Sequence, residues 1–274
     1  MYGNTIIEIP GDTDFDPVKT FECGQCFRWN ADKNGVYTGI ASNRAAKVWR
    51  ENKSVFISCA PGDYTGFWRN YFDLDRDYAA LRNQLDTGDY LKKAVEFGTG
   101  IRILRQDKWE ALCSFVISQC NNIMRIKKII EALAKSFGKP ITFEGQTLYC
   151  FPEAEDIAVL TPADLDQIRC GYRSEYIIEA ARAVSSGILD LDRLSKTGYK
   201  QALTELKSLK GVGEKVANCV ILYGLHIHEA FPVDVWMKKA LSAHFADDFR
   251  PESFGKAAGL AQQYIFYYTR SGNL

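Results

Sequence analysis

The sequence predicts an α+β fold, with an N-terminal antiparallel β-sheet domain followed by an all-helical region. The first hundred residues contain short strand-like segments separated by turn residues, whereas apolar residues after position 98 recur at helical spacing. With 274 residues and 46% hydrophobic content, the chain has enough apolar material for one large core or two modest ones. We predict two domains, over residues 1–98 and 99–274.

Four strands are expected in the N-terminal domain. They cover residues 25–29, 36–40, 46–50 and 54–59. Asn34-Gly35 separates the first two strands and is a typical hairpin turn. A short helix is expected around residues 77–85, and Gly98-Thr99-Gly100 marks the change to a helical pattern.

Beyond residue 98, apolar side chains gather on helical faces. One face holds Trp109, Leu112, Cys113, Val116 and Ile117, and the next holds Ile126, Ile129, Ile130, Leu133 and Phe137. Thr161-Pro162 is expected to start another helix, Gly187 to end the one after it, and residues 254–269 to form the last.

Composition excludes several classes of protein. The net charge is zero, so the chain is not a generally basic nucleic-acid coat. No stretch approaches the ~18 to 20 apolar residues that span a bilayer, and the first residues lack the pattern of a secretory signal. Eight scattered cysteines suit reduced thiols. We therefore expect a cytoplasmic protein with no membrane partner.

Neither a metal nor a cofactor is expected. Cys23 and Cys26 form a Cys-x-x-Cys, but no second cysteine pair or nearby histidine completes four zinc ligands. The only histidines are His226, His228 and His244, and no cluster of C-terminal cysteines suits an iron–sulfur centre.

The strongest functional motif is a helix-hairpin-helix at about residues 199–225. Helical residues lead into Lys210-Gly211-Val212-Gly213, and a second helix starts at Glu214. Two glycines allow a tight turn and close approach to a partner, while the positive end of the second helix favours a phosphate oxygen. Gly211 and Gly213 are therefore candidate contacts to the DNA backbone. The alternative is an ordinary tight turn between two helices.

Lys215 and Asp234 are the candidate catalytic residues. Lys215 lies in the first turn of the second helix, where the helix dipole and desolvation both disfavour the ammonium form and favour a nucleophilic amine. Asp234 stands in the apolar frame Phe231-Pro232-Val233-Asp234-Val235-Trp236, just before another helical pattern. The alternatives are a solvated charge for Lys215 and a helix N-cap for Asp234, and the N-cap role is compatible with catalysis.

Leu209 to Cys219, read with Pro232-Val233-Asp234-Val235, resembles the helix-hairpin-helix (HhH-GPD) DNA glycosylases, and more narrowly the 8-oxoguanine DNA glycosylase/AP lyase branch. The resemblance implies that Lys215 attacks the sugar, displaces the base and forms an imine, after which β-elimination cuts the strand. Asp234 then stabilises positive charge on the sugar. The implied function is excision of 8-oxoguanine, preferentially opposite cytosine, in base excision repair, by a monomer that binds double-stranded DNA containing oxidised guanine.

The resemblance also implies a base-binding pocket. Gly24, in Gly24-Gln25-Cys26-Phe27-Arg28-Trp29, matches the family glycine whose carbonyl meets the lesion, and Cys219 belongs to the matching hairpin motif. Gln262 and Phe266 match the base-clamping pair, and their spacing of four puts them on one helical face.

Two further segments resemble the family's DNA-probing loops, Cys120-Asn121-Asn122-Ile123-Met124-Arg125 and Gly171-Tyr172-Arg173. The resemblance implies that Asn121 and Asn122 probe the duplex, that Tyr172 wedges into it, and that Arg125 and Arg173 meet the orphan cytosine. Phosphate contact is the alternative for both arginines.

Three positions depart from the eukaryotic pattern: Cys120 replaces the first of three asparagines, Trp236 replaces a histidine, and Thr269 replaces an acid. Two other functions remain open. One is a glycosylase for alkylated bases, which needs no nucleophilic lysine, and the other is a non-catalytic helix-hairpin-helix DNA-binding module.

Overall fold

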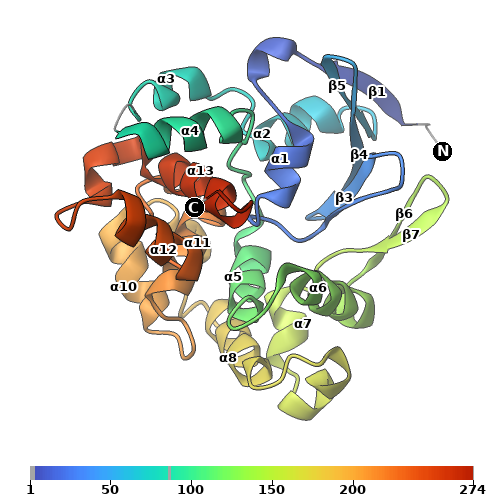
Figure 1. The fold of residues 1–274 in the computed structure, drawn as a ribbon. Coiled ribbons are helices and arrows are strands. Elements are labelled where there is room, and N and C mark those ends of the chain that lie inside the picture. Colours follow the sequence, from blue (N-terminus) through green and yellow to red (C-terminus); the bar gives the residue numbers. More distant parts are fainter. Residues whose placement is uncertain (1–3, 86–87, 274) are drawn as a thin grey trace.

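The computed structural model describes residues 4–85 and 88–273 and contains an antiparallel sheet followed by a helical body (Figure 1). The sheet strands are β1 (Thr5–Ile9), β2 (Trp29–Ala31), β3 (Tyr37–Ala41), β4 (Arg44–Glu51) and β5 (Ser54–Cys59). Their order is β1-β5-β4-β3-β2, and every neighbouring pair is antiparallel. The predicted α+β class is confirmed.

Strands β3, β4 and β5 match the prediction, but the strand expected at residues 25–29 is wrong except for its last residue. The buried amide of Gln25 explains the difference. It donates to the Arg102 carbonyl at 2.8 Å and accepts the Leu104 N–H at 2.9 Å, so a side chain replaces the pairing that a strand would make. Strand β1, which pairs with β5, was not predicted.

The helices are α1 (Pro17–Glu22), α2 (Arg69–Tyr71), α3 (Tyr78–Arg82), α4 (Gly88–Gly98), α5 (Lys108–Ile117), α6 (Ile123–Phe137), α7 (Ala154–Ala158), α8 (Arg173–Ser185), α9 (Leu191–Leu194), α10 (Tyr199–Lys207), α11 (Glu214–Tyr223), α12 (Val235–His244) and α13 (Ala258–Arg270). The helix expected to start at Thr161-Pro162 is a 3-10 helix over Pro162–Ile168. The last predicted helix begins as a 3-10 helix over Pro251–Ala257 and continues as α13.

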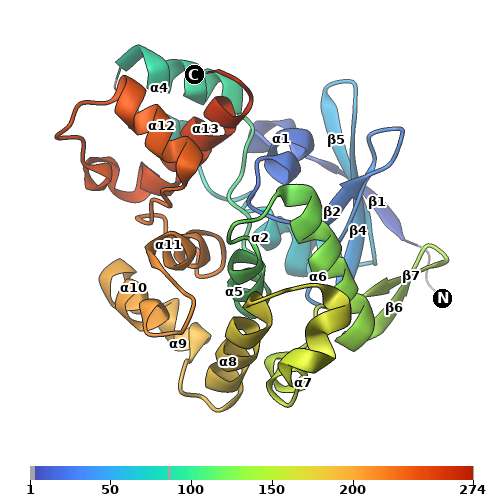
Figure 2. The same cartoon turned by 60° about the horizontal axis from the view of Figure 1, so that its bottom comes forward.

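A β-hairpin interrupts the region that was expected to be all helical. Its strands are β6 (Pro140–Phe143) and β7 (Gln146–Tyr149), and it projects toward the N-terminal sheet (Figure 2). At its tip, Glu144 forms an ion pair with Lys47 and accepts hydrogen bonds from Asn4 and Ser58. These contacts anchor the hairpin to the sheet, which local periodicity does not reveal.

Two apolar cores follow the division into sheet and helices, but α3 and α4 belong to the second. Helix α4 packs along α13 (Figure 1), and Tyr78, Leu91 and Ala94 are buried in the helical core. Residues 78–98 thus connect the predicted first domain to the C-terminal helices, and a boundary at 98/99 stays a prediction. Within residues 4–85 and 88–273, no helix has both the length and the apolar character needed to cross a bilayer.

Candidate active site and DNA interface

The predicted hairpin is formed by α10 and α11, and its two glycines serve different purposes. Gly211 has a φ of +78°, and a Cβ there would lie 2.2 Å from the Tyr176 ring, so both conformation and packing require glycine. Gly213 has an ordinary φ of −82° with open space around it, and it is the N-cap of α11. Its exposed position leaves the first N–H groups of α11 accessible.

Lys215 lies in the first turn of α11 and is half-buried. Its Nζ donates a hydrogen bond to Ser118 Oγ at 3.1 Å and lies 5.8 Å from the centroid of the Phe115 ring. Ser118 is the C-cap of α5, so the amine is held against the end of a second helix. Nothing in the sequence pattern singled out Ser118.

The Cys219 thiol lies near enough to both predicted catalytic residues for their charges to act on it. Burial raises the pKa of this thiol, the Lys215 charge lowers it, the Asp234 charge raises it, and a side-chain hydrogen bond with Lys215 lowers it further. Both charges therefore act on one buried sulfur, and the fold brings these three residues into one site.

Asp234 is the N-cap of α12, as the sequence predicted. Its Oδ1 accepts the backbone N–H groups of Trp236 at 3.0 Å and Met237 at 2.9 Å. Within the described part of the chain, no hydrogen bond or ion pair engages Oδ2. One carboxylate oxygen therefore serves the helix, and the other is available for chemistry.

Asn218 was missed by the sequence analysis, although it links the two catalytic segments. Its Oδ1 accepts hydrogen bonds from the Tyr199 hydroxyl at 3.0 Å and from the Phe231 N–H at 3.3 Å, and its Nδ2 donates to the Glu214 carbonyl. Asn218 is 3% exposed. A polar residue on the otherwise apolar face of α11 was the available signal.

Gly24 and Phe266, from opposite ends of the chain, lie against each other. Gly24 has a φ of +87°, and a Cβ there would lie 3.1 Å from Phe266 and 3.2 Å from Arg270 Nη1. The ring thus packs directly on the glycine.

The Gln262 amide is buried and already oriented by protein groups. Its Nε2 donates to the Pro232 carbonyl at 3.0 Å, and its Oε1 accepts from the Tyr223 hydroxyl at 3.2 Å. The same hydroxyl lies 2.8 Å from Gln263 Oε1, and Gln263 Nε2 donates to the Cys23 carbonyl next to Gly24. Tyr223 and Gln263, which the sequence analysis did not identify, thus link Gln262 by hydrogen bonds to the residue before Gly24.

The loop that the resemblance assigns as the first probing loop connects α5 to α6. Asn122 is the N-cap of α6 and accepts the Arg125 N–H at 3.0 Å, while Asn121 Nδ2 donates to the Ile117 carbonyl at 3.2 Å. Cys120 has a φ of +47°. The Arg125 side chain is exposed and has no hydrogen bond or ion pair with any described residue. It is therefore available to a partner.

Tyr172 and Arg173 are neighbours in the sequence but differ in their exposure to solvent. Tyr172 is 54% exposed, as a wedge residue should be, whereas Arg173 is 4% exposed. The Arg173 guanidinium donates to the carbonyls of Gln119 (2.9 Å from Nε), Cys120 and Cys170, and its centre lies 4.5 Å from the Tyr172 ring. Arg173 thus braces the first probing loop. Its contact with the opposite base stays a prediction, and it requires the guanidinium to leave some of these carbonyls.

Thr269 and Trp236, which depart from the eukaryotic pattern, both contact other residues of this chain. Thr269 is fully buried and bonds both the Ile265 carbonyl at 2.6 Å and the Tyr90 hydroxyl at 2.7 Å. The Trp236 ring faces Lys239, with 4.9 Å between Nζ and the ring centroid. Thr269 therefore joins α13 to α4 and does not face a partner.

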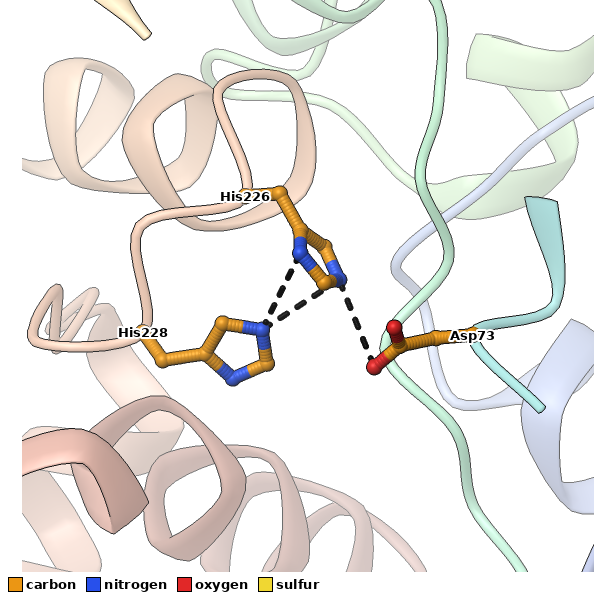
Figure 3. A group of neighbouring side chains, drawn as sticks. All are labelled: Asp73, His226 and His228. Carbon is orange, nitrogen blue, oxygen red and sulfur yellow. Dashed lines mark hydrogen bonds and ion pairs between the residues drawn. The ribbon is translucent and has the colours of Figure 1, made fainter. Parts of the chain in front are cut away.

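A buried cluster of Asp73, His226 and His228 lies outside this site (Figure 3). His226 Nε2 lies 3.2 Å from the Ile103 carbonyl and 3.6 Å from Asp73 Oδ2, and His228 Nε2 lies 3.3 Å from His226 Nδ1. With both rings neutral, His228 donates to His226, which donates to Ile103. The two histidines thus link the segment after α11 to the Ile103 carbonyl in the segment before α5, with the Asp73 carboxylate beside them.

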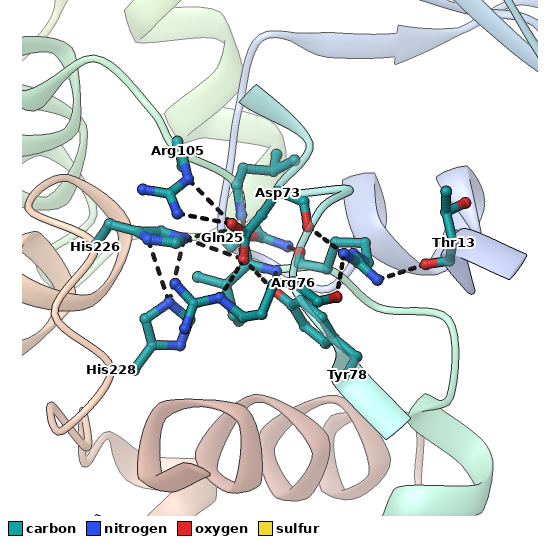
Figure 4. A network of polar contacts seen from close by, with 11 residues as sticks. Thr13, Gln25, Asp73, Arg76, Tyr78, Arg105, His226 and His228 are labelled. Atoms are coloured by element: carbon teal, nitrogen blue, oxygen red, sulfur yellow. Dashed lines mark hydrogen bonds and ion pairs between the residues drawn. The ribbon is translucent and has the colours of Figure 1, made fainter. Parts of the chain in front are cut away.

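Arginines surround the carboxylate of this cluster (Figure 4). Asp73 Oδ1 accepts from Arg105 Nε at 3.0 Å, and Oδ2 accepts from Arg76 Nε at 2.7 Å and from the Tyr78 hydroxyl. Two guanidinium charges already neutralise the carboxylate, so the donor set does not suit a divalent cation.

Comparison with known proteins identifies the family to which the chain belongs. Residues 8–112 match the family described as the 8-oxoguanine DNA glycosylase N-terminal domain, and residues 113–254 match the HhH-GPD superfamily of base excision DNA repair proteins. An N-glycosylase/DNA lyase from Saccharomyces cerevisiae is 40% identical over 80% of this chain and 65% of its own length. A DNA-3-methyladenine glycosylase from Bacillus subtilis is 34% identical over 74% of this chain and 64% of its own length.

The chain thus spans slightly less than two thirds of these two curated relatives. Among solved structures, the 8-oxoguanine glycosylase/lyase of Clostridium acetobutylicum, in complex with double-stranded DNA containing cytosine opposite 8-oxoG, superposes with a TM-score of 0.90 and 35% identity. The match covers 100% of this chain and 97% of that one. The chain therefore belongs to the HhH-GPD superfamily of base excision DNA repair proteins, and its N-terminal region is of the 8-oxoguanine DNA glycosylase type.

Proposed function

We propose that this protein is a bifunctional DNA glycosylase/AP lyase that excises 8-oxoguanine, preferentially opposite cytosine, from duplex DNA. The observation that carries the proposal is the placement of the Lys215 amine beside Ser118 and Cys219, with Asp234 acting on the same thiol. A helix-hairpin-helix that only held DNA would need neither this amine nor this carboxylate.

In the proposed reaction, the neutral Lys215 amine attacks C1′ of the damaged nucleotide. The C1′–N9 bond breaks, its electron pair leaves with the base, and a proton lost by the amine neutralises the departing base. Opening of the sugar ring gives an imine between Nζ and C1′. Removal of a C2′ proton then expels the 3′ phosphate by β-elimination. Asp234 Oδ2 stabilises the positive charge that develops on the sugar.

Recognition of the base is assigned to Gly24, Gln262 and Phe266. 8-Oxoguanine carries a hydrogen-bond donor at N7, where guanine has an acceptor, so the Gly24 carbonyl accepts from the lesion and repels the normal base. One such contact is worth roughly 1 to 3 kcal/mol. The Gln262 amide provides both a donor and an acceptor for the pairing edge, and the Phe266 ring provides a stacking face.

Borohydride trapping tests the proposal directly. The protein is incubated with a duplex containing 8-oxoguanine opposite cytosine, and reduction of the imine leaves a covalent protein–DNA adduct. Lys215→Gln should abolish both base release and the adduct while duplex affinity is retained, because the amine is needed for chemistry and not for the phosphate grip. Lys200→Gln, which removes an exposed lysine from α10, serves as the control and should react normally.

The relationship to a DNA-3-methyladenine glycosylase of Bacillus subtilis supports a second candidate, excision of alkylated bases. Parallel assays with 3-methyladenine and 8-oxoguanine duplexes separate the two functions. Release of 3-methyladenine but not of 8-oxoguanine, without a trapped adduct, would show that the protein excises alkylated bases and would contradict the proposed activity. Tight binding without release of either base would identify a non-catalytic DNA-binding module.

A further inference from the structure

We infer that Ser118 is a positioning residue that aims the attacking amine of Lys215. The inference rests on the proposed function, because it concerns the same nucleophile. Ser118 is the C-cap of α5 and Lys215 lies on α11, so only the packing of these two helices brings them together. Their contact is the hydrogen bond of 3.1 Å between Nζ and Oγ.

The direction of this hydrogen bond is fixed by a second one. Ser118 Oγ donates its hydrogen to the Phe115 carbonyl at 2.8 Å, one turn earlier in the chain. A serine hydroxyl has one hydrogen and two acceptor lone pairs. Because that hydrogen is already engaged, Ser118 meets the lysine as an acceptor only.

An acceptor is the useful partner for a nucleophilic amine. A neutral amine has two N–H groups and one lone pair, and the lone pair must face the sugar carbon. A hydroxyl that donated to Nζ would occupy this lone pair, whereas Ser118 takes an N–H and leaves the lone pair free. The Ser118 hydroxyl is therefore the contact that orients this amine, while the Nζ lies 5.8 Å from the centroid of the Phe115 ring.

The place of Ser118 in the fold also couples the amine to the DNA-probing loop. Ser118 directly precedes Gln119 and Cys120, whose carbonyls accept hydrogen bonds from Arg173. Arg173 in turn follows the proposed wedge Tyr172. A shift of the loop on binding to DNA is therefore transmitted to the acceptor that holds the amine.

The test compares Ser118→Ala with Ser118→Thr, which retains the hydroxyl. Ser195→Ala is the matched control, because Ser195 is also a helix C-cap whose Oγ bonds the carbonyl three residues earlier, at Asp192, but it lies on α9 away from the amine. Each protein is assayed in single turnover on two duplexes, one with 8-oxoguanine opposite cytosine and one with a preformed abasic site, where no base has to be recognised. Duplex affinity and melting temperature are measured in parallel.

For Ser118→Ala we expect base excision and borohydride-trapped adduct formation at the abasic site both to slow by ~10- to 100-fold, since misplacement of a reacting group by about 1 Å has effects of this order. Duplex affinity should stay within about twofold, and Ser118→Thr and Ser195→Ala should remain near the unaltered rate. An unchanged rate in Ser118→Ala, a loss confined to the 8-oxoguanine duplex, or failure of Ser118→Thr to restore the rate would overturn the inference. If the unaltered protein forms no adduct at all, the proposed function itself fails.

Discussion

Asn218 accepts the backbone N–H of Phe231 at 3.3 Å, and this contact ties the helix that carries Lys215 to the segment that carries Asp234. The relative placement of the amine and the carboxylate therefore depends on a side chain that takes no part in the reaction.

Asn218→Ala should lower the single-turnover excision rate by ~10-fold or more, because it removes the hydrogen bond that holds the Lys215 helix to the segment carrying Asp234. It should also destabilise the protein by ~1 to 3 kcal/mol, since buried donors lose their acceptor. Tyr199→Phe removes a different hydrogen bond of the same Asn218 side chain and should leave excision near normal. If Asn218→Ala excises at the normal rate well below its melting temperature, the alignment is set elsewhere.

Asp234→Asn should separate the two roles of that residue. Asparagine caps a helix about as well as aspartate, so the two bonds to Trp236 and Met237 should persist and the melting temperature should change little. Turnover should nevertheless fall by orders of magnitude, because the negative charge beside the sugar is lost. Excision rates and melting curves, measured on the same preparations of the unaltered protein and of Asp234→Asn, separate the catalytic role from the capping role. A variant that melts earlier but turns over normally would leave Asp234 with a structural role alone.

The two hairpin glycines should respond differently to alanine. Gly211→Ala places a methyl group against the Tyr176 ring at a positive φ, so we expect a loss of stability together with weaker DNA binding. Gly213→Ala meets no atom within 4 Å and should fold normally, so any loss of affinity there reports close approach of the DNA backbone. Equal melting temperatures for the two variants would contradict this assignment.

Arg125 and Arg173 should make excision fastest opposite cytosine. Two contacts to its O2 and N3 edge, each worth ~1 to 3 kcal/mol, give a measurable preference over adenine. Arg125→Ala and Arg173→Ala should both weaken the preference. Only Arg173→Ala should also lower the melting temperature, because the carbonyls of Gln119, Cys120 and Cys170 lose their donor. Single-turnover rates on duplexes that differ only at the opposite base are the measurement. If the preference for cytosine survives in both variants, these arginines contact the phosphate backbone and not the opposite base.

The histidine chain should make the protein sensitive to acid. Burial lowers the pKa of His226 to about 3, with Arg105 and Arg76 contributing, and burial together with His226 lowers the pKa of His228 to about 2. An unfolded histidine titrates near ~6.5. Below that pH the unfolded chain therefore binds protons that the folded chain excludes, and the free energy of unfolding falls as the pH falls from about 6.5 toward 3.

Glu110 opposes this trend, since burial raises its pKa to about 7 despite the nearby Arg28, and the folded state takes up its proton first. Two histidines contribute at most ~2.7 kcal/mol per pH unit, and one carboxyl offsets at most ~1.4. Urea unfolding between pH 6.5 and 5.0 should therefore show stability decreasing toward acid, more steeply in Glu110→Gln. Replacement of both His226 and His228 by asparagine should remove the decrease, and an unchanged slope in that variant would refute the assignment.

The sequence alone determined the features that depend on local spacing. The glycine turn before a helix start predicted the hairpin, the carboxylate before a helical pattern predicted the Asp234 cap, and alternating and helical periodicities separated sheet from helices. Each of these is an interaction among neighbouring residues, which side-chain type and backbone preference decide directly.

Only the tertiary structure decided which distant residues meet. Ser118 and Lys215 are 97 positions apart, and Gly24 and Phe266 lie near opposite ends of the chain. The Arg173 side chain is buried against the carbonyls of Gln119 and Cys120, although its sequence neighbour Tyr172 is exposed. These contacts join helix ends and irregular loops, where no periodicity records which side chain faces inward. They are set by how the helices pack around a shared core, and the final orientation of the amine depends on that packing.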